Sequence, residues 1–235
     1  MTFAEVMAEL EAKGSETTKR TLVKHGAKEP FWGTKIGDMK PMVKKIKKNH
    51  ALALELYETG ISDAMYFAAL ICDPKAMTKA QLNKWVKAAT WHMLSSYAVA
   101  WPAAESPHAR ELALEWIESK KEQIANAGWC TYSGLVALKP DDQLDLKEIA
   151  GLMKRIEKEI HGTMNRVKYS MNGFLIAVGS YIPSLTAAAK AISKAIGPVV
   201  VDMGDTSCEV PDAVAYIDKV INAGKHGIKK KTVFC

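Results

Sequence analysis

The sequence predicts an all-α protein, and three observations lead to that class. Apolar residues recur three or four positions apart along almost the whole chain of 235 residues, which is the spacing of amphipathic helices. Short breaks rich in glycine, proline and aspartate separate these segments. Strand signals are scarce, since only residues 199–201 are densely β-branched, and we expect that run to be merely extended.

Thirteen helical segments are expected, each bounded by a recognisable break. The breaks are marked by Gly14, Gly60, Asp73-Pro74, Trp101-Pro102, Ser106-Pro107, Pro140, Gly162 and Pro183. The predicted helices cover residues 3–13, 15–25, 38–49, 51–59, 62–71, 78–90, 92–101, 108–118, 121–137, 145–160, 165–181, 184–195 and 211–222. Because most of the loops are short, consecutive helices should be antiparallel neighbours.

The helices recur in pairs about every 35 to 40 residues from roughly residue 50 onward, close to the period of HEAT-type units. Two segments, WHMLSSYAVAW and MNGFLIAVGSYI, are apolar on more than one side, as the inner layer of stacked helix pairs requires. We therefore expect a curved, right-handed α-solenoid of about six antiparallel helix pairs, folded as one domain over residues 1–235. A globular bundle has the same helices and remains the alternative.

The most basic helix is predicted within FWGTKIGDMKPMVKKIKKNH, residues 31–50. Its apolar stripe consists of Ile36, Met39, Val43 and Ile46, and we expect the last three to be buried. Asp38 is a suitable N-cap, which places Pro41 in the first turn, where proline is tolerated. The opposite flank carries Lys40, Lys44, Lys47 and Lys48. These lysines form either a solvated face or a surface for an anionic partner.

Composition narrows the class of partner. The 48% of hydrophobic residues suffices for one sizeable core, and the formal charge of +6 with a pI near 9.0 favours nucleic acid or an acidic surface. The opening residues, MTFAEVMAELEAKG, have early acidic side chains and no apolar block, unlike a signal peptide. No apolar run approaches the roughly 18 residues of a membrane span. We expect a cytoplasmic monomer with no membrane partner.

Metal and cofactor chemistry is not expected. The cysteines Cys72, Cys130, Cys208 and Cys235 lie far apart with no CxxC spacing, which favours buried thiols over disulfides or zinc ligands. His92, His161 and His226 have no cysteine or glutamate at ligand spacing, so we expect them to be ordinary core or surface residues. The prediction is therefore no metal and no cofactor.

The segment FWGTKIGDMKPMVKKIKK resembles the F-x-G-x-x-x-x-x-[LM]-[KR] opening motif of the AlkD-like DNA alkylation-repair proteins, the HEAT-like-repeat DNA glycosylase superfamily. The ladder of short helix pairs that follows is also similar, so the resemblance covers nearly the whole chain. It implies a curved helical solenoid whose basic concave groove binds duplex DNA. In active members it implies hydrolysis of the N-glycosidic bond of N3- or N7-alkylated purines. Lys40, Lys44, Lys47 and Lys48 would then contact phosphates.

The resemblance weakens at the catalytic positions. Active members carry a W-x-x-x-D motif, whose best match here runs from Tyr97 to Trp101, with tyrosine at the Trp position and tryptophan at the Asp position. The family's groove arginine falls near Gly128-Trp129 and its second groove tryptophan near Gly173-Phe174. An indole cannot replace a carboxylate beside a developing cation. No catalytic residue is therefore assigned; if the protein is active, the candidates are Tyr97, Trp101 and Glu105.

An acidic turn, VVVDMGDTSCEVPD at residues 199–212, offers a second place for chemistry. It contains Asp202, Asp205, Cys208, Glu209 and Asp212, and such carboxylates can hold a metal or act as acid and base. Aspartates are also common in loops because they bond to their own backbone, and residues 209–212 are typical of a helix start. We expect the second, structural role.

Further candidate DNA contacts lie in two basic clusters and three aromatic residues. Asn165, Arg166 and Lys168 open a long helix, where free N–H groups favour a phosphate unless the start is simply capped. Residues 224–235 form a basic tail, which is either a contact or a frayed end. Tyr97, Trp101 and Trp129 are either core residues or stacking platforms for a base or sugar. The tail's basic residues are Lys225, His226, Lys229, Lys230 and Lys231, of which Lys229 and Lys230 are the candidates.

Three functions follow from the sequence. The favoured one is a DNA-binding member of the alkylation-repair superfamily that contacts duplex, branched or distorted DNA with weak or no base excision. The second is an active alkylpurine DNA glycosylase with a rearranged site. The third is a HEAT-like adaptor for an acidic protein.

Overall fold

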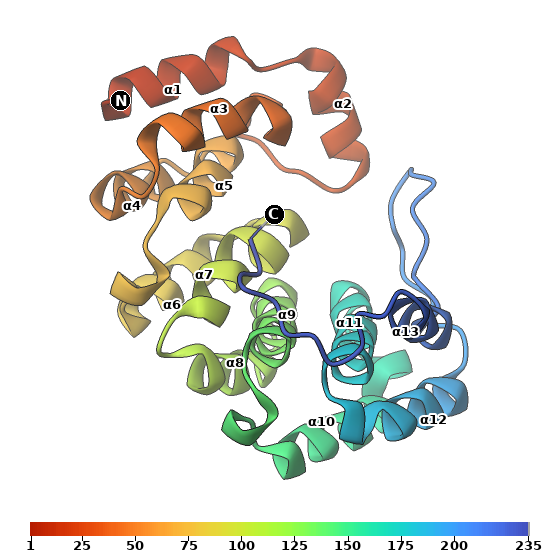
Figure 1. Cartoon of the computed structure of the whole chain (residues 1–235). Coiled ribbons are helices and arrows are strands. Elements are labelled where there is room, and N and C mark those ends of the chain that lie inside the picture. The colour runs from red at the N-terminus through yellow and green to blue at the C-terminus, as the bar shows by residue number, and fades with distance from the viewer. Residues whose placement is uncertain (235) are drawn as a thin grey trace.

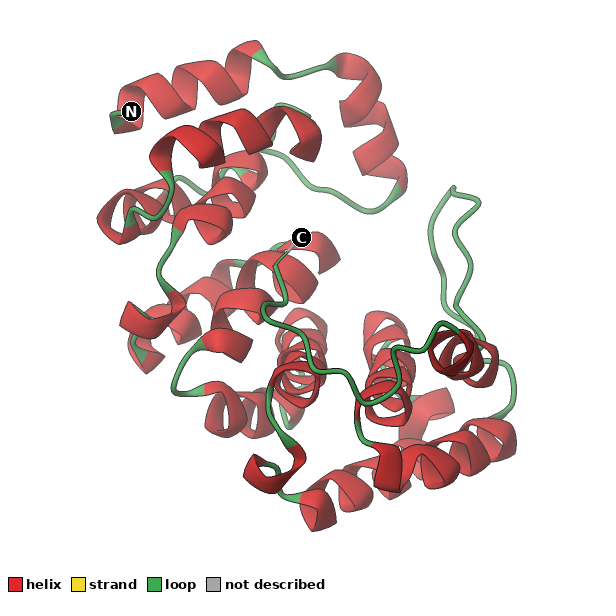
Figure 2. Ribbon diagram, in the orientation of Figure 1, coloured by secondary structure: helices red, strands yellow, loops and turns green. Residues whose placement is uncertain are grey.

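The computed structural model describes residues 1–234, and this part of the chain contains thirteen α-helices and no strand (Figures 1 and 2). The expected single domain, basic tail and Cys235 each reach residue 235, which lies outside the described residues. The α-helices are α1 (Phe3–Ala12), α2 (Glu16–Lys24), α3 (Ile36–Ile46), α4 (His50–Glu58), α5 (Ser62–Ile71), α6 (Lys79–Ala88), α7 (Ala100–Glu105), α8 (Ala109–Ile117), α9 (Glu122–Leu138), α10 (Leu146–Glu159), α11 (Asn165–Tyr181), α12 (Thr186–Ile196) and α13 (Ala213–Asn222). A π-helical segment, η2 (Leu94–Val99), runs directly into α7, and short 3-10 turns are η1 (Pro74–Ala76), η3 (Asp141–Gln143), η4 (Ile160–Gly162) and η5 (Pro183–Leu185). The all-α prediction is confirmed.

The helices form an arc of two layers around an open centre (Figure 1). Along the inner layer α5 contacts η2, α7 contacts α9, and α9 contacts α11. Each inner helix also packs on an outer partner, as in the pairs α4 with α5, α8 with α9, and α11 with α12. The solenoid expected from the helix spacing is therefore observed. Helix α11 and the N-terminal helices lie on opposite sides of the arc.

Two hydrophobic cores fill the arc, one in each half. In the N-terminal core the Tyr57 and Trp85 rings stack with centroids 3.9 Å apart, and the Tyr57 hydroxyl donates to the Trp85 carbonyl at 2.9 Å. In the C-terminal core Trp129 packs against Phe174 with their ring centroids 5.3 Å apart. Burying such rings stabilises a fold by about 3–5 kcal/mol each relative to alanine. The helices of each half are thus held at fixed positions behind the inner surface.

The basic helix α3 differs from the prediction at its start. It begins at Ile36 rather than Asp38, with Lys35 at the N-cap position, so Asp38 lies in the first turn and complements the helix dipole. Pro41 is consequently inside the helix. Its missing N–H would have met the carbonyl of the exposed Gly37, which water can solvate.

The buried stripe of α3 is also shifted. Met39 and Met42 are the core residues at 2% exposure each, whereas Val43 and Ile46 are only half-buried. The expected burial of Val43 and Ile46 is therefore wrong, and Met42 was missed. Ile36, Val43 and Ile46 still pack against the N-terminal core, but they are partly exposed.

The break expected at Trp101-Pro102 is wrong, because the helix continues through Pro102 to Glu105. The preceding turn is π-helical over Leu94–Val99. Proline cannot donate to the carbonyl four residues before it and crowds that carbonyl, and a wider turn relieves both effects. Trp101 and Glu105 therefore lie on one continuous helix, one turn apart.

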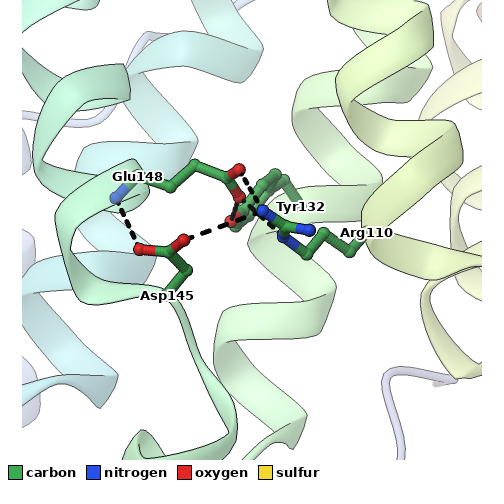
Figure 3. A network of polar contacts seen from close by, with 4 residues as sticks. All are labelled: Arg110, Tyr132, Asp145 and Glu148. Carbon is green, nitrogen blue, oxygen red and sulfur yellow. Dashed lines mark hydrogen bonds and ion pairs between the residues drawn. The ribbon is translucent and has the colours of Figure 1, made fainter.

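A polar network fixes the outer repeats to the inner helix α9 (Figure 3). Arg110 on α8 donates to both carboxylate oxygens of Glu148 on α10, at 3.0 and 2.6 Å. The Tyr132 hydroxyl on α9 donates to the same carboxylate, and the N-cap Asp145 accepts from the Glu148 N–H at 2.9 Å. Bidentate arginine–carboxylate pairs are geometrically specific. Three consecutive helices are thereby held in register on the convex side.

Helices α11 and α12 form a sharply bent pair. The break at η5 bends the chain by 117° between them. Within residues 1–234 no single helix is long and apolar enough to cross a membrane, and only this bent pair passes by length and composition.

Candidate nucleic-acid interface

Three of the four predicted α3 lysines border a recess on the inner surface. Lys40, Lys44 and Lys48 line a cavity of about 660 Å³, which we call the lysine recess. Within residues 1–234 neither Lys40 nor Lys44 forms an ion pair, and Lys48 lies 3.6 Å from Asp73. Lys47 ends the helix with φ 62° and does not line the recess. The positive charge of α3 is thus available to an anion at this place.

A second cavity, of about 810 Å³, adjoins the first, and we call it the aromatic recess. Ile36, Lys40 and Tyr66 line both recesses, so the two are continuous. Its walls come from α2, α3, α5, the π-helical segment with α7, the start of α11, and the loop over residues 197–212. The recess is therefore surrounded by both halves of the arc.

Trp101 lies at the junction of the two recesses among three other rings. Its ring centroid is 5.2 Å from that of Tyr97, 6.0 Å from that of Tyr66 and 5.6 Å from that of Phe234. Tyr97 is 37% exposed and Trp101 is half-buried. Tyr97 and Trp101 thus face the aromatic recess, as a stacking surface requires. Tyr66 and Phe234 are groove residues that sequence reasoning missed.

The basic tail is an ordered strap rather than a frayed end. It runs along the C-terminal ends of the inner helices, where the Gly227 N–H donates to the Ser180 carbonyl and the Lys230 N–H to the Ala137 carbonyl. Figure 1 shows its path from α13 across α11 and α9 to α7. Cationic residues at helix C-termini complement the negative end of the dipole. The strap therefore ties α11, α9 and α7 together.

Two tail residues proposed as DNA contacts have different surroundings. The Lys229 side chain is 18% exposed, and its ammonium pairs with Asp141 at 2.8 Å and donates to the Val136 carbonyl at 3.0 Å. It is committed to the fold in this structure, which corrects its assignment as a free DNA contact. Lys230 uses its backbone for the strap and keeps an exposed side chain.

Glu105, the candidate substitute carboxylate, is held by the end of the strap. One of its carboxylate oxygens accepts from the Thr232 hydroxyl and from the Val233 N–H, the latter at 2.9 Å. The side chain borders the lysine recess beside Thr232 and Phe234. In the sequence, the apolar pair Val233-Phe234 is the feature of the basic tail that could have indicated this contact with Glu105.

The start of α11 is already capped. The Arg166 N–H donates to the Glu122 carboxylate at 2.8 Å, so a carboxylate occupies the position expected for a phosphate. Asn165 is paired with the Asp202 backbone through two hydrogen bonds of 2.8 and 2.7 Å. The Arg166 guanidinium nevertheless lines the aromatic recess, next to Met203 at 3.5 Å, and Lys168 is half-buried. Arg166 remains a candidate through its side chain, whereas the helix end itself does not.

The acidic turn has the structural role expected for it. Asp202 accepts from the Gly204 N–H at 2.8 Å, and Asp212 caps α13 by accepting from the Ala215 N–H at 2.7 Å. Asp205 pairs with Lys24 at 2.7 Å, which joins the loop tip to the end of α2. Residues 199–201 form no strand. In residues 1–234 no three His, Cys, Asp or Glu side chains gather as a metal site would require.

The other expectations for single residues are mixed. Trp129 is 0% exposed and lies in the core, which corrects its assignment as a DNA contact. Cys72 is buried as expected, but Cys208 is exposed and borders the aromatic recess. His161 is exposed and near the Ile196 carbonyl, while His226 contacts the Thr186 hydroxyl.

His92 lies at the aromatic recess beside Trp91, with ring centroids 5.3 Å apart. Burial lowers the pKa of His92 to about 4, and the positive charges of Arg166 and His25 act in the same direction. The imidazole is therefore neutral at pH 7, so it offers the recess a hydrogen-bonding ring without a charge.

Comparisons with known proteins agree with this geometry. A family model described as DNA alkylation repair enzyme matches residues 6–209. An uncharacterised protein of Listeria innocua is 35% identical over 228 residues, covering 94% of this chain and 98% of that protein. An uncharacterised protein of Listeria monocytogenes is 34% identical over 231 residues, covering 96% and 100% respectively.

A solved structure is similar over the full length of both chains, with a TM-score of 0.90 and 40% sequence identity. That protein is described as part of a new family related to the HEAT-like repeat DNA glycosylases with affinity for branched DNA structures. The resemblance inferred from the residues is thus confirmed. The chain belongs to the DNA alkylation repair enzyme family and has its HEAT-like repeat fold.

Proposed function

We propose that this protein binds duplex and branched or distorted DNA through its concave surface and releases alkylated bases weakly or not at all. The observation that carries the proposal is that Trp101 packs among Tyr66, Tyr97 and Phe234, at the position to which the family resemblance assigns the carboxylate of active members. The DNA-binding part is supported by the lysines of the lysine recess. It is also supported by the similar structure, whose protein is described as having affinity for branched DNA.

The lysines supply the affinity. Each phosphate neutralised by a lysine releases condensed counterions, a sequence-independent contribution that weakens as salt rises. Lys40 and Lys44 are one helical turn apart on an exposed face and have no acidic partner among residues 1–234. They are therefore free to meet adjacent phosphates without first breaking an ion pair.

Weak excision follows from charge. Cleaving the glycosidic bond of a cationic purine leaves positive charge on the sugar, and one preorganised group opposite such charge is commonly worth about 100- to 1,000-fold in rate. The Trp101 ring offers at most about 2 kcal/mol to a cation, on the order of 30-fold. Glu105, one turn away, is already engaged by Thr232 and Val233.

Two assays on the same protein test the proposal. Gel shifts with a blunt-ended duplex and with a three-way junction should show binding that weakens steeply as the salt concentration rises. Release of N3- and N7-methylated purines from methylated duplex should stay near the protein-free rate. Rapid release that Glu105→Gln abolishes would show an active glycosylase instead. Absence of binding to either DNA at low salt would leave the adaptor function.

A further inference from the structure

The aromatic recess presents ring faces to a space that no described side chain fills. Tyr97 is 37% exposed and lines this cavity. Trp101, Phe31 and Trp91 line the same cavity. Contiguous apolar surface of this kind marks a binding site more often than chance exposure does.

Cations border these rings. Arg166 lies on one wall of the recess and Lys40 on another, and Lys40 continues into the lysine recess with Lys44. Aromatic faces on which bases stack, beside a positively charged path for the backbone, are the combination by which proteins hold unpaired nucleic acid. The chemistry of the recess thus matches a nucleotide better than an apolar ligand.

The recess is closed on the side opposite α3 by the loop over residues 197–212. Met203, Cys208 and Glu209 form this wall, which is fastened to α11 through Asn165 and to α2 through the Lys24–Asp205 pair. A cavity of about 810 Å³ lies within the range of small-molecule sites, roughly 300–1,000 Å³, so it has room for a single nucleobase.

We propose that the aromatic recess holds one unpaired nucleobase from a branch point or bulge, stacked on Tyr97 and Trp101, while Lys40, Lys44 and Arg166 contact the flanking phosphates. The inference rests on the DNA-binding function proposed above and names the feature of DNA that the site selects. A base at a branch is already unpaired, so placing it in the recess costs less than extracting a base from a duplex. Branched DNA is thereby preferred over duplex without any sequence being read.

The experiment uses the full chain and 2-aminopurine, a fluorescent base that is quenched by stacking. One DNA carries it as a single-nucleotide bulge, and a matched duplex carries it paired. The bulged DNA should bind more tightly than the duplex, and its fluorescence should fall on saturation. Trp101→Leu and Tyr97→Ser should each weaken bulge binding by about 5- to 150-fold, the range of one base–aromatic stack, and should weaken duplex binding less than bulge binding.

Tyr216→Ala is the matched control, because Tyr216 is 46% exposed on α13 and does not line the recess. It should leave the bulge affinity and the quenching intact. Tyr97→Ser, at the more exposed ring, should fold even if Trp101→Leu does not. Equal affinity of wild type and Tyr97→Ser for the bulge, or unquenched fluorescence in a saturated complex, would overturn the inference while DNA binding stands. Failure to bind any DNA would overturn the proposed function as well.

Discussion

The Glu105 carboxylate accepts the backbone N–H of Val233 at 2.9 Å, joining the middle of the arc to a residue 128 positions further along the chain. The same oxygen accepts from the Thr232 hydroxyl, and Phe234 follows against Trp101. One carboxylate thus anchors the end of the strap at the border of the lysine recess.

Glu105→Ala should release this anchor. The lost bonds have a charged acceptor but are partly exposed, so we expect the free energy of unfolding to fall by about 1 kcal/mol in urea denaturation. Limited proteolysis should cut the tail faster than in wild type. Glu115→Ala, at an exposed position on α8, should change stability by less than about 0.5 kcal/mol. A tail as resistant as that of wild type would show that Glu105 does not hold it.

The strap shows where sequence reasoning stops. Helix ranges follow from local periodicity and caps, and nearly all were predicted to within a few residues. Residues 229–234 carry no such pattern, and their partners on α9 and α7 lie about a hundred positions away. The sequence shows only that these lysines are positively charged. It does not show that Lys229 is paired with Asp141 and is therefore not available to bind a phosphate.

The candidate site was likewise only half predictable. The spacing of Tyr97 and Trp101 placed both rings on one helix face, and the groove position followed from the family resemblance. Trp129 has the same residue type and a similar apolar setting, yet it is fully buried, because α9 is enclosed by α8 and α11. Which side of an apolar helix meets solvent depends on its neighbours, and the sequence of the helix does not specify them.

Replacing Lys40 and Lys44 together by alanine should weaken DNA binding and flatten its salt dependence. Each phosphate contact contributes about −0.9 to the slope of log K against log salt, so the double variant should lose about 1.8 from that slope. Gel shifts or anisotropy at several salt concentrations measure it. Lys154→Ala with Lys158→Ala, on the outer helix α10, is the matched control for net charge. An unchanged slope in the α3 variant would reduce these lysines to a solvated face.

Stability should fall as pH is lowered below neutrality, because the pKa of His92 is about 4 in the folded protein against an ordinary value of 6.5. Below pH 6.5 the unfolded chain takes up a proton that the folded chain refuses, so this contribution to stability is complete above pH 6.5 and is lost down to pH 4. Between pH 7.5 and 5 we expect a loss of about 1–2 kcal/mol from this residue in denaturant titrations.

His92→Gln should remove that part of the pH dependence. His108→Gln, at a half-buried position outside the aromatic recess, is the control and should retain the wild-type profile. Equal losses in wild type and His92→Gln between these two pH values would mean that other groups are responsible.

Gly204→Ala should detach the loop tip from α2. Gly204 has φ +75°, and an added Cβ would lie 2.1 Å from the Lys24 carbonyl oxygen. Amide exchange over residues 202–206 should therefore speed up, while global stability changes by about 1 kcal/mol or less because the exposed loop can move away. Gly197→Ala is the control, since φ is +69° but no atom lies within 4 Å of the new Cβ. Equal exchange in both variants would attribute the effect to backbone strain alone.

The last prediction is that a carboxylate at position 101 raises base release. Trp101→Asp combined with Tyr97→Trp gives the chain the W-x-x-x-D motif that the family resemblance implies for active members, at positions that line the aromatic recess. If the missing charge is what limits catalysis, release of N7-methylated purines should rise by up to about 100- to 1,000-fold over wild type. Removing the Trp101 ring leaves Tyr66 and Phe234 without their common neighbour, so any variant at position 101 will be less stable than wild type. Base release must therefore be assayed below the midpoint temperature of each variant's unfolding. Trp101→Asn with the same Tyr97→Trp change is the matched control, because it has nearly the same shape without the charge. Activity in the aspartate variant alone would identify the carboxylate as the lost component. Equal base release by both variants would show that the Trp101 indole merely blocked the site. Base release by neither would mean that catalysis is limited by the position of the water or the sugar and not by the missing charge.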